Sequence, residues 1–210
     1  MSNSSDERLA LVIAAIDRAN ADDPNLVADT DGRVPAELLY GRRMSETLAR
    51  LSPAASEHVR IAARGQHIER WTTPRRSYPE GRVGYLKWRN DLKEMHARRV
   101  GAIMAEVGYG SDDITRVQSL LRKERLKSDA ETQAIEDTAC LVFLEHYLDE
   151  FMKKIERDKL RGILAKTWNK MSPRGREMAL GLAIAPEVST LLEQGLAQLR
   201  AGRAPRGAAS

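Results

Sequence analysis

The chain has 210 residues, 42% apolar and 30% charged, with a formal net charge of +4, 5% aromatic residues and one cysteine, Cys140. The single thiol excludes an internal disulfide, no apolar run, 139–144 included, is long enough to cross a bilayer, and the scarcity of aromatic residues argues against a β-rich fold. Together with a polar N-terminus that lacks a secretory signal, these features predict a cytoplasmic helical protein without a membrane partner.

Helical spacing of apolar residues accounts for the first part of the chain. Leu9, Val12 and Ile16 recur on one face of a first helix, and Pro35 is a favourable first residue for a second. In chain order we predict a helix from about residue 6, a turn-rich connection over 21–34, a helix from Pro35 that buries residues up to Leu51, and a helix capped by Ser52 that runs to about Arg70.

The rest of the chain is predicted to be helical after one ordered loop. Prolines and threonines place the loop at 71–80, and Gly108 ends the helix that follows it. The expected helices are 83–107, one from Ser111 into the basic cluster 122–127, then 129–152, 157–171, 173–183 and 186–199, with a disordered basic tail at 202–210. The sequence therefore predicts an all-α fold, a single domain over residues 1–201 with about eight helices around helix 129–152.

The helix predicted over 129–152 carries acidic residues close to the core. Its centre is apolar on every side, which is typical of a buried helix, and extending its deepest stripe puts Asp137 on the inward face with Glu136 beside it. A buried carboxylate needs a cation, a metal or a proton. Two interpretations stay open: an ion pair with Arg122, Lys123 or Arg125 on the preceding helix, or a metal or substrate ligand.

Two histidines also fall on inward helical positions. His67 lies four residues after Ala63, and His96 lies four residues after Leu92, so each continues an apolar stripe. Together with Asp137 they predict a site for a divalent metal ion, either Mg, Mn, Fe or Zn. The alternative is that both are hydrogen-bonded core histidines, because no HExxH or CxxC spacing accompanies them.

The region 60–99 combines positive charge with aromatic residues. It contains eleven Arg or Lys residues against four acidic ones. Arginine binds phosphate through a fork of N–H groups, and aromatic faces stack on bases or cations. We therefore predict an anionic small-molecule substrate, with nucleic acid as a possible partner, unless the region is a solvated basic surface. The candidate substrate-binding residues are Arg70, Arg75, Tyr78, Lys87, Trp88, Arg89, Lys123 and Lys127.

Four segments carry a resemblance to a known family. They are Glu37-Leu38-Leu39-Tyr40, Gln66-His67-Ile68-Glu69-Arg70-Trp71, Tyr85-Leu86-Lys87-Trp88-Arg89 and the stretch 136–145. Through them, about residues 9–182 resemble the family called domain of unknown function 4202, whose name implies no activity.

A second, more distant resemblance suggests a reaction class. The layout is similar to the HD superfamily of helical metal-dependent phosphohydrolases, in which a small-residue run precedes a His-Asp pair and a later helix supplies another aspartate. Residues 62–68 stand in the place of the run and pair, with Gln66-His67 instead of His-Asp, and Asp137 stands in the place of the later aspartate. Residues 42–44 stand near the place of the family's earlier histidine. The resemblance implies an HD-like fold.

These observations predict a metal-dependent hydrolase that acts on a phosphate-containing small molecule or nucleotide. The metal would lower the pKa of a bound water, and Glu69 or Glu136 would accept its proton. With redox-active iron, the HD resemblance would also imply oxygenation. The alternative is a non-catalytic module that binds a nucleotide or RNA through the region 60–99, with the histidines and Asp137 in structural roles.

Overall fold

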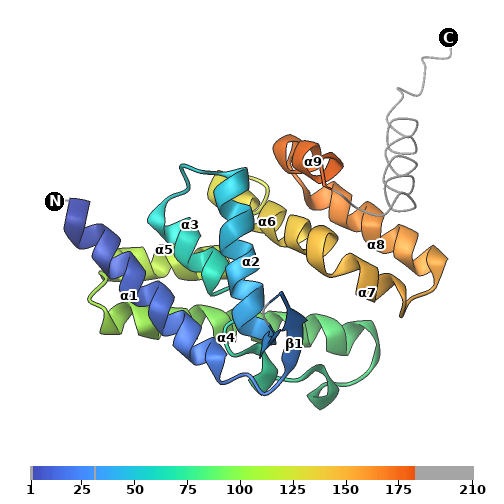
Figure 1. Cartoon of the computed structure of the whole chain (residues 1–210), viewed down its shortest axis with the longest axis horizontal. Coiled ribbons are helices and arrows are strands. Elements are labelled where there is room, and N and C mark those ends of the chain that lie inside the picture. The colour runs from blue at the N-terminus through green and yellow to red at the C-terminus, as the bar shows by residue number, and fades with distance from the viewer. Residues whose placement is uncertain (1, 31, 183–210) are drawn as a thin grey trace, which may run out of the picture. The chain divides into compact units, whose positions relative to one another are not determined.

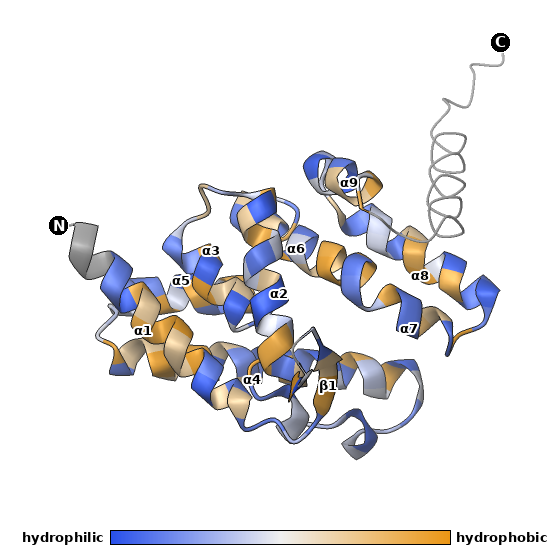
Figure 2. Cartoon of the chain, viewed as in Figure 1, coloured by the Kyte–Doolittle hydropathy of each residue, from blue (hydrophilic) through white to orange (hydrophobic). Residues whose placement is uncertain are grey.

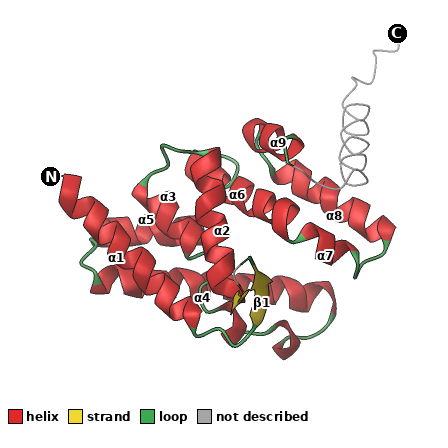
Figure 3. Ribbon diagram, in the orientation of Figure 1, coloured by secondary structure: helices red, strands yellow, loops and turns green. Residues whose placement is uncertain are grey.

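A computed structural model describes residues 2–30 and 32–182, in which helices joined by loops are accompanied by one short hairpin (Figures 1 and 3). The predicted all-α fold is therefore confirmed. The chain divides into two compact units, the first ending at Thr138 and the second beginning at Ala139. The single domain predicted over residues 1–201 stays a prediction, and the expected helix 186–199 and tail 202–210 lie outside the described residues.

The first unit contains six α-helices or parts of them, two short 3-10 helices (Arg70–Thr72 and Arg75–Ser77) and the hairpin among its described residues. In chain order the α-helices and strands are α1 (Ser2–Ala21), β1 (Leu26–Asp29), β2 (Gly32–Pro35), α2 (Ala36–Leu51), α3 (Glu57–Arg64), α4 (Gly81–Glu106), α5 (Ser111–Arg122) and the start of α6 (Ala130–His146). Helix α3 packs against α1, α2 and α5, while α4 packs against α1 and α5. In Figure 2, apolar and polar residues alternate along these helices, as expected for helices with one buried face.

The second helix shows how sequence determines local structure here. All the residues predicted to be inward on it, from Leu38 to Leu51, are buried. Pro35 precedes its first turn, and the backbone N–H of Glu37 donates to Oδ2 of Asp23 at 3.0 Å. Because the first N–H groups of a helix have no partner within it, this carboxylate stabilises the start of α2. The bond also fixes the position of Glu37, which matters for the site described below.

Two boundaries differ from the prediction. The connection 21–34 contains the hairpin, whose strands pair from Leu26 opposite Pro35 to Asp29 opposite Gly32. Both strands are largely exposed, so their sequence lacks the apolar alternation by which a half-buried strand is recognised. Helix α3 is also shorter than expected, because Ser56 rather than Ser52 caps it and Gly65 ends it.

The helix predicted over 129–152 is divided in two. Its start is correct, since Oδ1 of Asp129 accepts the backbone N–H groups of Glu131 and Thr132. However, α6 ends at His146, and a separate short helix, α7, spans Leu148–Met152. No proline or glycine marks the break at Tyr147, which is why apolar spacing alone joined the two helices.

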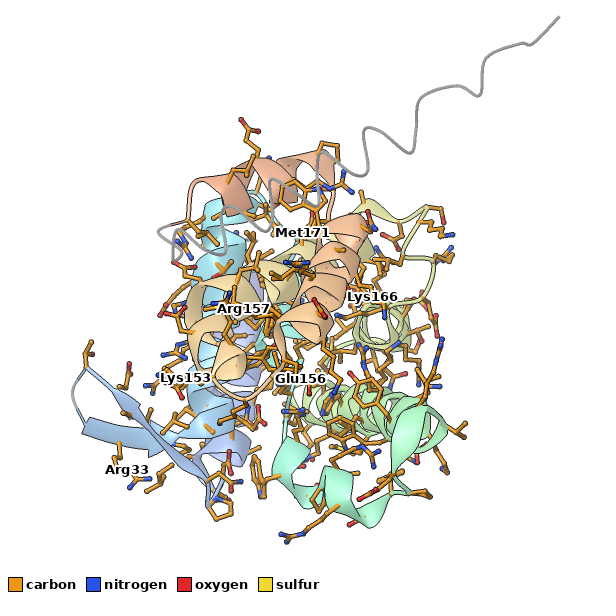
Figure 4. The ribbon with its side chains drawn as sticks, turned by 90° about the vertical axis from the view of Figure 1, so that its right-hand side faces the viewer. Arg33, Lys153, Glu156, Arg157, Lys166 and Met171 are labelled. Atoms are coloured by element: carbon orange, nitrogen blue, oxygen red, sulfur yellow. The ribbon has the colours of Figure 1, made fainter. Side chains whose placement is uncertain are left out.

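The second unit continues with two helices that the sequence predicted. Helix α8 spans Arg157–Lys170 and buries Leu160, Leu164 and Trp168, and α9 spans Pro173–Leu180. Figure 4 shows Arg157 and Lys166 on α8, with Met171 just beyond its end. None of the helices in the described part of the chain combines the length and hydropathy needed to span a membrane.

The absence of a side chain at Gly84 allows the loop 71–80 to pack closely against α4. A Cβ atom added at Gly84 would lie 1.9 Å from the carbonyl oxygen of Pro79, whereas one added at Gly162 in α8 would meet nothing within 4 Å. We expect Gly84→Ala to lower the free energy of unfolding by about 1–3 kcal/mol through overpacking. Gly162→Ala should instead raise it by about 0.5–1 kcal/mol, because alanine favours the helix. Urea denaturation of both variants checks this, and equal effects would contradict it.

Candidate functional site

His67 lies just after α3 and is held by two residues of α2. Its Nδ1 atom is 3.1 Å from Oε2 of Glu37, and its ring stacks on the ring of Tyr40 with a centroid distance of 3.8 Å. Glu37 and Tyr40 are three residues apart on one helix, so they lie on the same side of it. Ile68, fully buried, anchors the turn that carries His67. The position of this imidazole is therefore set by a hydrogen bond to Glu37, by stacking on Tyr40 and by the anchored turn at Ile68.

The next residue along this turn is in an unfavourable conformation. Glu69 has a φ of 51°, in the left-handed region that non-glycine residues rarely adopt. Its backbone N–H donates to Oδ1 of Asn20 at 2.9 Å, and its carboxylate accepts from Nε of Arg99 at 3.0 Å. The carboxylate predicted to accept a proton is thus engaged in an ion pair. Strained backbone that the surrounding contacts maintain is common at functional sites.

His96, on α4, faces His67 across the site. The ring centroids are 6.0 Å apart, and His96 is only 4% exposed. Its Nε2 atom is buried and has no hydrogen-bond partner among the described residues. Leaving a buried polar atom unpaired costs about 1–3 kcal/mol, so such atoms are rare in native proteins. This nitrogen is therefore a position at which a bound molecule would gain a hydrogen bond or a coordinate bond.

The surroundings of both imidazoles lower their pKa and so favour the neutral form at pH 7. Burial lowers the pKa of His67; the Glu37 carboxylate opposes this, while Arg70 and Lys123 lower it further. Burial, helped by His67 and Arg70, holds the pKa of His96 well below its usual value. Because a carboxylate only accepts hydrogen bonds, we assign the proton of His67 to Nδ1, which leaves Nε2 as an acceptor.

Arg70 connects the histidines to the predicted basic-aromatic region. Its guanidinium lies 3.5 Å from Oε1 of Glu37 and 5.1 Å from the centre of the Trp88 ring. Trp88 is buried, and its Nε1–H donates to the carbonyl oxygen of Thr73 at 2.8 Å. We call His67, His96, Glu37, Tyr40 and Arg70 the histidine cluster.

A buried ion pair lies within electrostatic reach of this cluster. Lys123, directly after α5, has a φ of 58°, and its Nζ atom lies 2.5 Å from Oε2 of Glu136 on α6. The ion pair expected between helix 129–152 and the preceding basic cluster is thus present, but it is formed by Glu136. Asp137, also buried, accepts a hydrogen bond from Nε2 of Gln133 at 2.8 Å.

The predicted metal ligands are brought together only in part. His67 and His96 face each other, whereas the carboxylate of Asp137 is bonded to Gln133. Within residues 2–30 and 32–182, no three His, Cys, Asp or Glu side chains are grouped as the ligands of a metal ion would be. The donors in the described part of the chain therefore do not fit a three-ligand centre, and the metal cofactor stays a prediction.

Most other predicted substrate-binding residues brace the loop 71–80 against α4. Arg75 donates to the carbonyl oxygens of Tyr78 and Gly81, and the Tyr78 hydroxyl donates to Asp91 at 2.9 Å. This bond to Asp91 raises the pKa of Tyr78. Lys87 also pairs with Asp91, at 2.7 Å. These groups are engaged within the protein, which reduces what the region 60–99 offers to a partner.

Two predicted binding residues form no hydrogen bond or ion pair with the histidine cluster among the described residues. The guanidinium of Arg89 lies 5.8 Å from the centre of the Tyr85 ring. Lys127 is exposed, and no described residue forms an ion pair with it. Of the predicted substrate-binding set, Arg70 and Trp88 are part of the cluster or contact it, and Lys123 acts on it by lowering the pKa of His67.

The comparisons with known proteins identify a family. The family model described as "Domain of unknown function (DUF4202)" matches residues 10–192. The chain belongs to the DUF4202 family. No curated protein and no solved structure matches it. The resemblance to the HD superfamily finds no support in these comparisons.

The segments that carry the DUF4202 resemblance supply residues of the candidate site. Separate segments of the sequence supply Glu37, His67, Trp88 and Glu136. The first three belong to the histidine cluster or contact it, and Glu136 pairs with Lys123, which lowers the pKa of His67. Sequence reasoning overlooked Glu37 as a site residue. The available signal was an acidic residue beside the inward Leu38, because a carboxylate at that position requires a partner.

Proposed function

We propose that this DUF4202 protein hydrolyses a phosphate-bearing small molecule at the histidine cluster. The observation that carries the proposal is the Nε2 atom of His96, which has no partner among the described residues. The ring of His96 faces the ring of His67, whose Nδ1 atom is held by Glu37. Two neutral imidazoles, fixed from several helices and accompanied by two cations, are better suited to reaction chemistry than to core packing. Perturbed titratable groups of this kind cluster at functional sites.

His67 is the general base of the proposed reaction. Glu37 orients its ring and fixes the proton on Nδ1, so that Nε2 takes a proton from the attacking water. His96 holds the water or a substrate oxygen through its free Nε2 atom. The water oxygen forms the new bond to phosphorus as the bond to the leaving oxygen breaks, and the proton on His67 is then available to that oxygen.

Arg70 and Lys123 bind the phosphate. Each already faces one carboxylate, but a guanidinium has five N–H donors and an ammonium group has three. Each therefore retains donors for phosphate oxygens and for the charge that develops in the transition state. No step of the proposed reaction is assigned to a metal ion, because the described donors do not form a three-ligand group.

The test is phosphate release from a panel of phosphomonoesters and nucleotides, with and without added Mg²⁺, Mn²⁺ or Zn²⁺. We expect the wild-type protein to hydrolyse at least one class of substrate and His96→Leu to lose this activity. Because the substitution removes an unsatisfied buried atom, the free energy of unfolding should stay unchanged or rise by about 1 kcal/mol. If no panel member is hydrolysed under any condition, or if His96→Leu is fully active, the proposal fails.

The same variant has a pH signature. The pKa values of the folded-state histidines lie below the unfolded value of 6.5, so the unfolded chain takes up protons first as the pH falls. The corresponding stability is present above pH 6.5 and is lost as the pH falls through the folded pKa values. Lowering the pH from 8 to 5 should therefore reduce the Tm of the wild type more steeply than the Tm of His96→Leu, as measured by thermal denaturation.

A further inference from the structure

The exposed side of α8 carries a row of lysines. Opposite the buried Leu160, Leu164 and Trp168, the helix exposes Lys159, Gly162, Lys166 and Lys170. Steps of three and four residues align these positions along one side of a helix. At 1.5 Å per residue, the row from the first lysine to the last is about 16 Å long. Figure 4 shows Lys166 on this helix.

Two of these lysines, Lys159 and Lys166, are exposed and at most weakly engaged by other charges. Lys166 has no ion-pair partner in the described part of the chain, and Lys159 pairs only with the exposed Glu156 at 2.9 Å. An ion pair between exposed groups is weak and readily exchanged. The acidic residue within α8, Asp158, lies 3.8 Å from Arg161, which offsets its charge. The row therefore retains its positive potential.

Gly162 interrupts the row without a packing reason. It is exposed in the middle of α8, and an added Cβ would meet nothing within 4 Å. Glycine weakens a helix relative to alanine, so the position carries a cost that the described contacts do not explain. The missing side chain leaves the helix backbone bare between Lys159 and Lys166, which allows a partner to approach closely there.

The chemistry of this surface, named here the α8 lysine row (Lys159, Gly162, Lys166 and Lys170), selects among anionic partners. No large apolar side chain on α8 is exposed. A docking protein needs apolar anchors at the centre of its interface, and insertion into a membrane surface needs an apolar helix face. Phosphodiester backbones require cations alone. We infer that the α8 lysine row binds the phosphate backbone of a nucleic acid.

The experiment measures binding of the full chain to a labelled RNA duplex, a DNA duplex and a single-stranded RNA at several salt concentrations. The test variant is Lys159→Glu with Lys166→Glu, and the matched control is Arg82→Glu with Arg98→Glu. Both pairs lower the net charge equally, and both control residues are exposed on α4 within the region 60–99. Comparison of the three probes identifies the strand type that is bound.

We expect the α8 variant to lose at least about tenfold in affinity and the slope of log affinity against log salt to shrink by about 1–2. The control should stay within about twofold of the wild type. A third variant, Gly162→Gln, changes no charge; it should raise the Tm yet weaken binding severalfold, because its side chain blocks close approach.

Several results would overturn the inference. Equal losses in both charge-reversal variants would indicate attraction by overall charge, and a loss confined to the control would place the interface in the region 60–99. Absence of binding to all three probes would also refute it. If poly-glutamate displaced the nucleic acid more effectively than unlabelled RNA, the row would be a site for an acidic protein. Unchanged affinity of Gly162→Gln would refute the role of the bare backbone.

Discussion

Substituting His67 by glutamine should lower kcat for the best substrate of the phosphate panel by about 10²–10⁴-fold, the usual contribution of general-base catalysis. Glutamine retains a donor for Glu37 but cannot take a proton from water at neutral pH. Steady-state phosphate release measures the loss. The matched control is His58→Gln, because His58 lies on the neighbouring helix α3 and pairs with Asp113 outside the cluster. Similar losses in the two variants would contradict the assigned role of His67.

The pH dependence tests the same role in a different way. A general base must be neutral, and burial places the pKa of His67 below 6.5. We therefore expect kcat/KM to be level near pH 7 and to fall as the pH drops through this lowered pKa. Since the Glu37 carboxylate raises the pKa of His67, Glu37→Gln should move the falling limb to lower pH as well as reduce the rate. A profile that does not move would show that Glu37 does not act on the titrating group.

The second large effect concerns stability. Glu136→Ala leaves the ammonium group of Lys123, which is 13% exposed, without its carboxylate, and breaking a largely buried pair in this way costs up to about 3–5 kcal/mol. Chemical denaturation of the full chain measures the change. The exposed pair formed by Lys153 and Glu150 is the control, and Glu150→Ala should leave the free energy of unfolding nearly unchanged.

A double substitution separates the value of this pair from the penalty of an unpaired charge. Lys123→Met combined with Glu136→Leu removes both charges and fills similar volumes, so the double variant should be far more stable than Glu136→Ala. Its activity should nevertheless be reduced, because Lys123 is one of the two proposed phosphate-binding cations. If the double variant were as unstable as Glu136→Ala, the unpaired charge of Lys123 would not be the cause of the lost stability.

The sequence identified the helices that carry the site with useful accuracy. The inward positions of α2 were correct, as was the end of α4 at Gly108, because both depend on local rules of apolar spacing and backbone conformation. The hairpin and the break at Tyr147 were missed, since exposed strands and an unmarked break leave no such signal.

The site was predictable only in part. Apolar stripes placed His67 and His96 on inward faces, and the structure brings their rings to 6.0 Å. The sequence could not show whether Glu136 or Asp137 forms the ion pair with the basic cluster. The centre of the predicted helix is apolar on all sides, so the pattern does not indicate which of the two acids faces that cluster. The left-handed turn at Lys123 decides it by aiming the ammonium group at Glu136.

The sequence by itself determined that this protein is built from helices, which face of each is buried, and that His96 points inward. Tertiary structure alone decided the partners: Glu37 for His67, Glu136 for Lys123, and none among the described residues for Nε2 of His96. The physical reason is that helical periodicity fixes directions around one axis. Distances between side chains on different helices depend on crossing angles and turns, which arise only when the helices pack together.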